Sequence, residues 1–261
     1  MKINNPFKKL PPAKRGLIAL AGIVALLLLA SFVDSKHQKN RCNSIVINIL
    51  DKEQFQFVKE AQVSKIVNRD IEDQLVGRKL SQIDLLDIQT RLMKNSYIKD
   101  AQVWIDMDGN MSVDVHQRRP IIRAIDPLNQ SYYLDDAGKR IPLNDQFSSY
   151  VPIATPGPID IRGFKDSLLR TYDSTLFVMA KALQKDSFMR ALTGQIVVSQ
   201  NFELTIVPRL GNFEIGLGDA ADLEDKFLRI KSFYKTSLPA AGWNTYKKIT
   251  VKYKNQIIAN R

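Results

Sequence analysis

An uninterrupted apolar run over residues 16–33 constrains this chain more than any other feature of its sequence. The run contains no charged residue, and Ser31 carries its only hydroxyl group. As an α-helix it would be about 27 Å long, which is close to the ~30 Å hydrocarbon core of a bilayer. Every face of that helix is apolar, whereas a helix at the surface of a soluble domain keeps a polar face. The run therefore predicts a transmembrane helix.

Charges next to the run orient the predicted span. Residues 1–15 carry five basic residues and no acidic one, and basic flanks favour the cytoplasmic side. A cleaved signal peptide needs small residues at positions −3 and −1, whereas exits after Ala30 or Ser31 would place Leu28 or Leu29 at −3. The prediction is a single-pass protein of the cytoplasmic (inner) membrane, with a cytoplasmic tail and an extracytoplasmic, or periplasmic, bulk.

The charge balance and the single cysteine limit the functions that the predicted exported region could have. All 27 acidic residues follow Val33. Without the five basic residues of the tail, 33 basic residues face these 27, a net charge of about +6. The positive charges of this region do not form a stripe interleaved with aromatic residues, as they do in many nucleic-acid-binding proteins. The sequence therefore argues against a nucleic-acid partner. Cys42 is the only cysteine, so no internal disulfide is expected.

Residues 43–120 have the pattern of a small α+β domain. The apolar, β-branched segment 44–50 predicts a strand. Apolar residues recur at helical spacing over 63–71 and again over 85–95, which predicts two amphipathic helices. Two helices of this kind would cover one face of a small sheet.

A β-hairpin is predicted at the end of this region. Apolar residues alternate on both sides of Asp108-Gly109-Asn110. A three-residue loop there pairs Met107 with Met111 and keeps both apolar sets on one face, which a two-residue loop would not do. The resulting order, strand–helix–helix–strand–strand directly after a membrane span, resembles a POTRA domain, a type that usually binds other chains rather than catalysing reactions.

Residues 121–261 predict a second, mixed α+β domain with an antiparallel-rich sheet. Alternating apolar positions predict a final strand in which Ile249, Val251 and Tyr253 share one face. Gly216 and Gly218 lie between a predicted strand and a predicted helix, as glycines do in a phosphate-binding loop. Asp219 and Asp222 lie at the start of that helix, where a bound phosphate would be, so the sequence argues against such a loop. The other expected elements are strands at 132–138, 140–143, 194–199, 202–207 and 213–217, helices at 168–183 and 223–234, and the final strand at 248–258.

Taken in order, five features of the chain resemble the bacterial cell-division family FtsQ/DivIB, and they cover nearly its whole length. The family often has Glu where this chain has Gln117, so a salt bridge that the family forms there is not expected here. The hinge that the resemblance implies at Arg119 and Pro120 does not depend on that residue. The features are the basic tail with one span, the POTRA-like unit, the strand closing in Gln117-Arg118-Arg119-Pro120, the turn Tyr133-Leu134-Asp135-Asp136-Ala137-Gly138 and the segment Val151-Pro152-Ile153.

The resemblance implies a non-catalytic divisome scaffold that supports septal peptidoglycan synthesis. Its implied partners are FtsB/FtsL-type (DivIC) division proteins and other divisome components, received by the last strands. By position, the implied partner-binding residues are Thr250, Lys252, Tyr253, Lys254 and Asn255. In the alternative interpretation, Tyr253 packs inward and the lysines only protect an open sheet edge from aggregation. The alternative function is a membrane-anchored envelope protein that binds or acts on cell-wall polymer.

No constellation of residues predicts catalysis. His37, His116 and Cys42 lack spaced partners for a metal site or a nucleophile pair. Asp135 and Asp136 stand before a glycine, where carboxylates usually form a turn. We therefore predict no enzyme activity, no cofactor, no metal, no nucleic acid and no small-molecule substrate.

Overall fold

The computed structural model describes residues 23–24, 41–69, 74–162 and 165–261. The predicted membrane span at 16–33 and the basic tail lie outside these residues, except for two residues of the span, 23 and 24, which are helical. None of the helices within the described ranges is long and apolar enough to cross a bilayer.

The chain divides into two compact units. Among the described residues, the N-terminal unit takes those up to Leu50 together with Lys59–Lys94 and Asp100–Val115. The C-terminal unit takes Asp51–Val58, Asn95–Lys99 and His116–Arg261. Residues 116–120, which the sequence groups with the first domain, thus pack with the second unit.

The N-terminal unit has the predicted order of strand, helix, helix, strand and strand. Its sheet has the order β1-β3-β2, and β1 runs parallel to β3 with Ile47 opposite Val113. The buried residues of the two helices, such as Val63 and Leu92, form the apolar stripes expected from their spacing. The elements are β1 (Ser44–Ile49), α2 (Glu60–Asn68), the 3-10 turn η2 (Leu80–Gln82), α3 (Leu85–Met93), β2 (Ile98–Ile105) and β3 (Asn110–Gln117).

The β2–β3 hairpin has the predicted three-residue loop, but the loop begins one residue earlier. The backbone N–H of Asp106 donates to the carbonyl of Asn110 at 3.0 Å, so residues 107–109 form the loop. Met107 is 97% exposed and does not pair into the core. The Asp106 carboxylate selects this register: it accepts from the side chain and the backbone of Asn110, and these bonds lower the pKa of Asp106. Gly109 supplies the left-handed residue, at φ +84°.

The C-terminal unit is built on a nine-stranded mixed sheet with the order β12-β11-β10-β9-β8-β7-β4-β5-β6. The pairs β4–β7, β7–β8 and β10–β11 are parallel, and the other neighbours are antiparallel, in agreement with the antiparallel-rich sheet that the sequence predicts. The strands are β4 (Pro120–Ile125), β5 (Ser131–Asp135), β6 (Arg140–Pro142), β7 (Ile153–Pro156), β8 (Thr193–Val198), β9 (Leu204–Pro208), β10 (Glu214–Gly218), β11 (Lys248–Thr250) and β12 (Ile258–Asn260).

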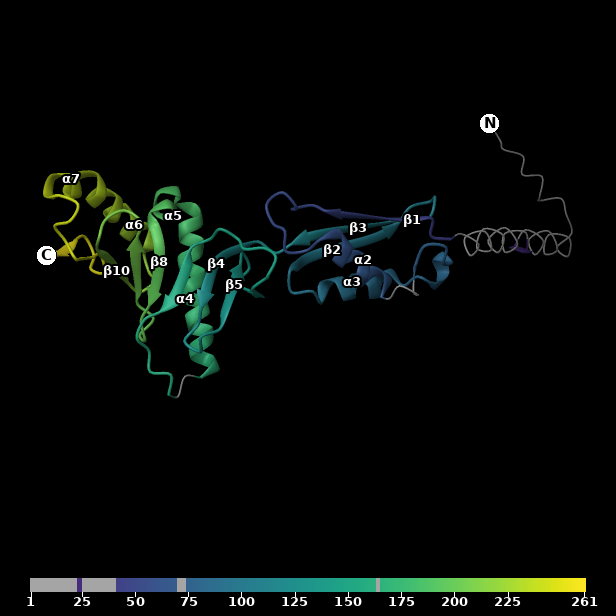
Figure 1. Cartoon of the computed structure of the whole chain (residues 1–261), viewed down its shortest axis with the longest axis horizontal. Helices are drawn as coiled ribbons and strands as arrows, with labels where there is room; N and C mark the ends of the chain where they lie inside the picture. The colour runs from purple at the N-terminus through teal and green to yellow at the C-terminus, as the bar shows by residue number, and fades with distance from the viewer. Residues whose placement is uncertain (1–22, 25–40, 70–73, 163–164) are drawn as a thin grey trace, which may run out of the picture. The chain divides into compact units, whose positions relative to one another are not determined.

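Helices pack against one face of this sheet and form the main core with it. They are α4 (Asp166–Lys185), α5 (Ser187–Leu192) and α6 (Leu223–Ser232), which continues through a π-turn, η3 (Phe233–Ser237), into α7 (Leu238–Ala241). Figure 1 shows α4, α5 and α6 alongside the sheet. A row of residues in register crosses the sheet and is buried with the helices: Tyr132, Ala124, Ala154, Ile196, Ile206, Ile215 and Ile249.

A buried polar network joins the β5–β6 end of the sheet to α4. The Arg140 guanidinium donates from Nε to Asp173 Oδ2 at 2.6 Å, and its Nη1 lies 3.5 Å from Asp126 Oδ2. The same guanidinium lies 4.0 Å from the centre of the Tyr132 ring. The Tyr132 hydroxyl donates to Asp173 Oδ1 at 2.5 Å, and burial raises the pKa of Tyr132 above its usual range. The Arg140 guanidinium thus pairs with two carboxylates, those of the fully buried Asp126 and the mostly buried Asp173.

Candidate functional site

The predicted final strand is shorter than the sequence indicates, and this changes the sheet edge. β11 covers only Lys248–Thr250, and residues 251–257 then reverse the chain. β12 returns antiparallel along β11, with Thr250 opposite Ile258. The reversal uses Asn255 at φ +57°, a left-handed conformation that Asn tolerates better than most residues. The prediction of a continuous strand over 248–258 is therefore wrong, and β12 forms the edge of the sheet.

Four of the five predicted partner-binding residues lie in the loop between β11 and β12. Thr250 ends β11, whereas Lys252, Tyr253, Lys254 and Asn255 follow it and are exposed. The Tyr253 side chain is 50% exposed, so it does not pack into the core as the alternative interpretation required. The structure therefore brings these residues together on one accessible turn.

Lys252 is held in place by contacts within the unit. Its amine pairs with the Glu203 carboxylate, and this hydrogen bond raises the pKa of Lys252. Its aliphatic stem lies over Gly218, where a Cβ atom would come within 2.7 Å of Lys252 Cγ. Gly216 also lies close to β11, because a Cβ there would be 3.3 Å from Thr250 Oγ1. The two glycines that weakly suggested a phosphate loop instead allow the close approach of this segment.

Arg229, on α6, anchors the loop, and sequence reasoning missed it. Its Nη1 donates to the carbonyl oxygens of Tyr253 at 2.5 Å and Gln256 at 2.9 Å. Its Nε and Nη2 pair with Asp225 one helical turn earlier. The bonded carbonyls lie 24 and 27 positions away, so no local spacing rule could have identified them.

We expect replacement of Arg229 by Gln to loosen the β11–β12 hairpin. Two charge-assisted hydrogen bonds to backbone carbonyls would be lost, each worth about 1.5 kcal/mol or more. Amide hydrogen exchange over residues 247–260 should accelerate about tenfold or more. Lys235→Gln removes an exposed cation from the adjoining π-turn and should leave this exchange unchanged. Equal exchange in both variants would show that Arg229 does not restrain the loop.

The outer edge of β12 is the accessible strand edge closest to these residues. No described strand pairs with β12 on its far side. Ile258 is 42% exposed on this strand, and Tyr253 is 50% exposed in the preceding loop. An open edge with exposed apolar side chains beside it can accept a strand from another chain.

The predicted hinge residues lie at the start of the second sheet. Pro120 is buried as the first residue of β4, and Arg119 is exposed. The Arg119 carbonyl accepts from the backbone N–H of Asp136 at 3.0 Å. Gln117, in place of the family's usual Glu, uses its amide for two backbone bonds, donating to the Phe55 carbonyl at 2.7 Å and accepting from Val58 N–H at 3.0 Å.

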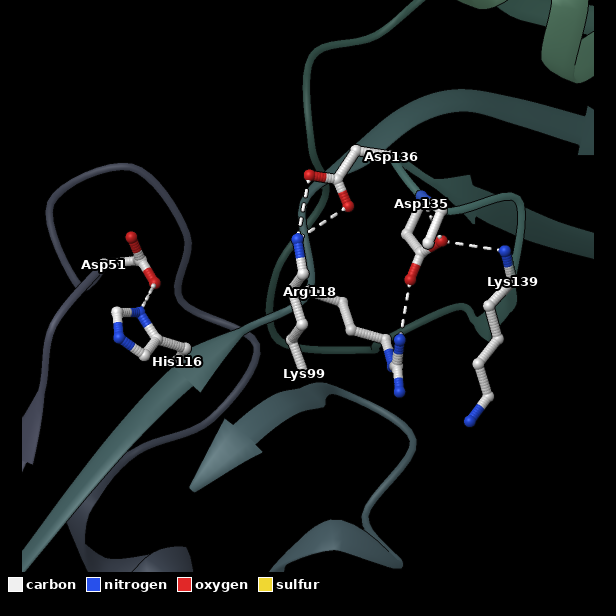
Figure 2. A network of polar contacts seen from close by, with 8 residues as sticks. Asp51, Lys99, His116, Arg118, Asp135, Asp136 and Lys139 are labelled. Atoms are coloured by element: carbon white, nitrogen blue, oxygen red, sulfur yellow. Dashed lines mark hydrogen bonds and ion pairs between the residues drawn. The ribbon is translucent and has the colours of Figure 1, made fainter. Parts of the chain in front are cut away.

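Asp135 and Asp136 form the predicted turn rather than a carboxylate pair for catalysis. Asp135 Oδ1 accepts from the backbone N–H groups of Ala137 and Lys139 at 2.9 and 2.7 Å. Figure 2 shows its other oxygen bonded to Arg118, at 2.8 Å, and Asp136 paired with Lys99, at 3.0 Å. Each carboxylate is thus engaged with its own basic partner.

The remaining residues considered for catalysis or metal binding are two histidines and the cysteine. His116 Nδ1 lies 3.2 Å from Asp51 Oδ2, as Figure 2 shows. Cys42 is buried, and burial raises the pKa of its thiol, which disfavours a reactive thiolate. His37 lies outside the described residues. Within the described ranges, no group of His, Cys, Asp and Glu side chains is arranged to hold a metal ion.

Comparison with known protein families gives two matches. A family model described as FtsQ/DivIB, C-terminal related, matches residues 119–260, which is more than half of the chain. A model of a POTRA-like domain matches residues 40–116. No curated protein matches the chain. The β11–β12 hairpin lies wholly within the first match.

Proposed function

Because this chain belongs to the FtsQ/DivIB family, we propose that it is a non-catalytic scaffold of the cell-division machinery, with FtsB/FtsL-type (DivIC) proteins as partners. The family assignment indicates a role in cell division. In the proposed role, the chain recruits and links these and other divisome components and so supports septal peptidoglycan synthesis. Residues 16–33 would anchor it in the cytoplasmic membrane, with residues 1–15 inside and both folded units outside.

The observation that carries this proposal is the unpaired edge of β12 beside an exposed loop. A partner strand that pairs with β12 would gain backbone hydrogen bonds, and its side chains would contact Ile258 and Tyr253. Lys254 and Asn255 are exposed and have no side-chain ion pair or hydrogen bond to a described residue, so they are free to contact that partner. Arg119 and Pro120 remain the proposed hinge, where they would adjust the direction of the second unit.

We expect Tyr253→Ala and Lys254→Glu each to weaken binding of an FtsB-type partner about tenfold. An interface tyrosine commonly contributes more than 1 kcal/mol, and 1.4 kcal/mol corresponds to a factor of ten in affinity. Lys252 is left unchanged because its contacts with Glu203 and Gly218 make it part of the fold. Titration calorimetry with the full-length chain in non-ionic detergent measures the effect.

The control variants are Val178→Ala and Lys235→Glu, which remove an exposed apolar side chain and reverse an exposed charge elsewhere on the same unit. Both should bind the partner within twofold of the unaltered chain. Thermal melting should show that all four variants stay folded. Normal binding by both Tyr253→Ala and Lys254→Glu would mean that the partner docks on another surface.

A further inference from the structure

A second surface of the C-terminal unit carries basic side chains and no acidic ones. A hollow of about 670 Å³ lies among residues 54–55, the start of β4, the segment 149–152 that precedes β7, α5 and the end of β9. Its lining includes Arg119, Arg190 and Arg209 and contains no acidic residue. The surface does not overlap with the β11–β12 hairpin.

The three arginines are exposed, and none forms an ion pair with any residue in the described ranges. The guanidinium of Arg209 donates from Nε to the Thr193 carbonyl at 3.2 Å, which leaves its terminal nitrogens available. It also lies 5.7 Å from the centre of the Tyr150 ring. Arg119 lies 6.0 Å from the centre of the Phe55 ring.

Several other arginines of the same unit pair with a carboxylate, although Arg123, Arg170 and Arg261, like the three of the hollow, form no ion pair with a described residue. Arg118, Arg140, Arg162 and Arg229 each pair with an aspartate. Two acidic residues adjoin the lining in sequence: Asp186 pairs with Lys231 at 2.5 Å, whereas Glu53, next to Gln54, is exposed and is not among the lining residues. Like charges around one hollow repel each other, and this repulsion is weakened when a ligand brings negative charge. The charge arrangement therefore favours an anionic ligand.

The remaining lining residues favour a polypeptide over a simple anion or a polyanionic sugar. Tyr150 is 89% exposed at the hollow, and exposed tyrosine beside arginine is the composition of protein-binding hot spots. Pro120, Ile121, Val151 and Pro152 add apolar surface to the same walls. A ligand that complements both features carries carboxylates and an apolar side chain within a few residues of each other.

We propose that this hollow binds an acidic segment of another polypeptide, whose carboxylates pair with the three arginines while an apolar side chain packs against Tyr150. Arginine suits this task because its planar guanidinium binds a carboxylate through two parallel hydrogen bonds. The site would act alongside the β12 edge and does not depend on it. It would let the chain hold two partner segments at once.

The test uses a fluorescein-labelled peptide, Asp-Glu-Phe-Asp-Glu-Leu, and its neutral twin, Asn-Gln-Phe-Asn-Gln-Leu. Fluorescence anisotropy measures binding to the full-length chain in non-ionic detergent. We expect the acidic peptide to bind at least tenfold more tightly than the twin. Changing Arg119, Arg190 and Arg209 together to Gln should weaken acidic-peptide binding at least tenfold. Tyr150→Ala should weaken binding of both peptides severalfold.

A matched triple variant, with Lys139, Arg170 and Lys235 changed to Gln, removes three exposed cations elsewhere on the unit. It should bind the acidic peptide within twofold of the unaltered chain. The variant lacking the three arginines of the hollow should stay folded, with a melting temperature only a few degrees lower, because it loses the hydrogen bond from Arg209 to the Thr193 carbonyl. Equal weakening in both triple variants, or equal binding of the neutral twin, would overturn the proposal. Tighter binding of an acidic oligosaccharide such as an alginate fragment than of the peptide would also overturn it.

Discussion

Arg140→Ala is expected to lower the free energy of unfolding of the C-terminal unit by about 3 kcal/mol. The variant leaves the fully buried Asp126 carboxylate and the mostly buried Asp173 carboxylate without their shared cation. Removing one partner of a buried ion pair costs far more than the pair contributes, because an uncompensated charge stays in a poorly solvated site. The Tyr132 ring would also lose the guanidinium that packs on it.

Chemical denaturation followed by circular dichroism measures this loss, and the melting temperature should fall by about 6 to 12 °C for a unit of this size. Arg162→Ala is the matched control, because the Arg162–Asp160 pair is exposed to water and should contribute little or nothing to stability. Adding Asp173→Asn to Arg140→Ala should recover part of the lost stability, since it removes one unpaired charge. A change of less than about 1 kcal/mol for Arg140→Ala would mean that water enters the site and compensates both carboxylates.

Gly218→Ala is expected to destabilise the C-terminal unit by about 2 kcal/mol and, under the proposed function, to weaken binding of an FtsB-type partner. Gly218 has φ +73°, a left-handed conformation that is strained for alanine. The new methyl group would also lie 2.7 Å from Cγ of Lys252, near the rigid base of that side chain. Lys252 would have to move, and its pair with Glu203 would be disturbed.

Gly77→Ala separates the two causes of this loss. Gly77 has φ +85°, but nothing lies within 4 Å of the position that its Cβ would take. It should therefore show the backbone strain alone, about 1 kcal/mol. Denaturation curves of both variants give the comparison, and calorimetry with the FtsB-type partner gives the effect on binding. If the two substitutions cost the same, the Lys252 stem moves without resistance and does not restrain the hairpin.

Elements with a strong local pattern follow from the sequence. The predicted helix at 168–183 is α4, and the predicted strands at 194–199 and 213–217 are β8 and β10. The Asp135 turn was also foreseen, because its carboxylate bonds backbone groups only two and four residues away. The predicted register of the β2–β3 hairpin was wrong by one residue. The hydrogen bonds of Asp106 with Asn110 set the observed register, and the alternation of apolar residues does not reveal them.

The candidate site could be only partly located from the sequence. Tyr253, Lys254 and Asn255 were predicted to lie on a continuous final strand, whereas the structure places them in the exposed loop between β11 and β12. An alternating pattern fits a strand and a tight hairpin equally well over so few residues. The left-handed Asn255 and the return of β12 onto β11 distinguish the two, and both depend on pairing that the pattern does not specify.

The sequence by itself determined the apolar run, the two α+β patterns and the family, because each depends on the order of residues along the chain. Only the tertiary structure decided which side chains meet. Arg229 reaches carbonyls more than 20 residues away, and three arginines separated by up to 90 positions line one hollow without an acidic partner. Such meetings depend on how the strands of a nine-stranded sheet are ordered, and no local periodicity encodes that order.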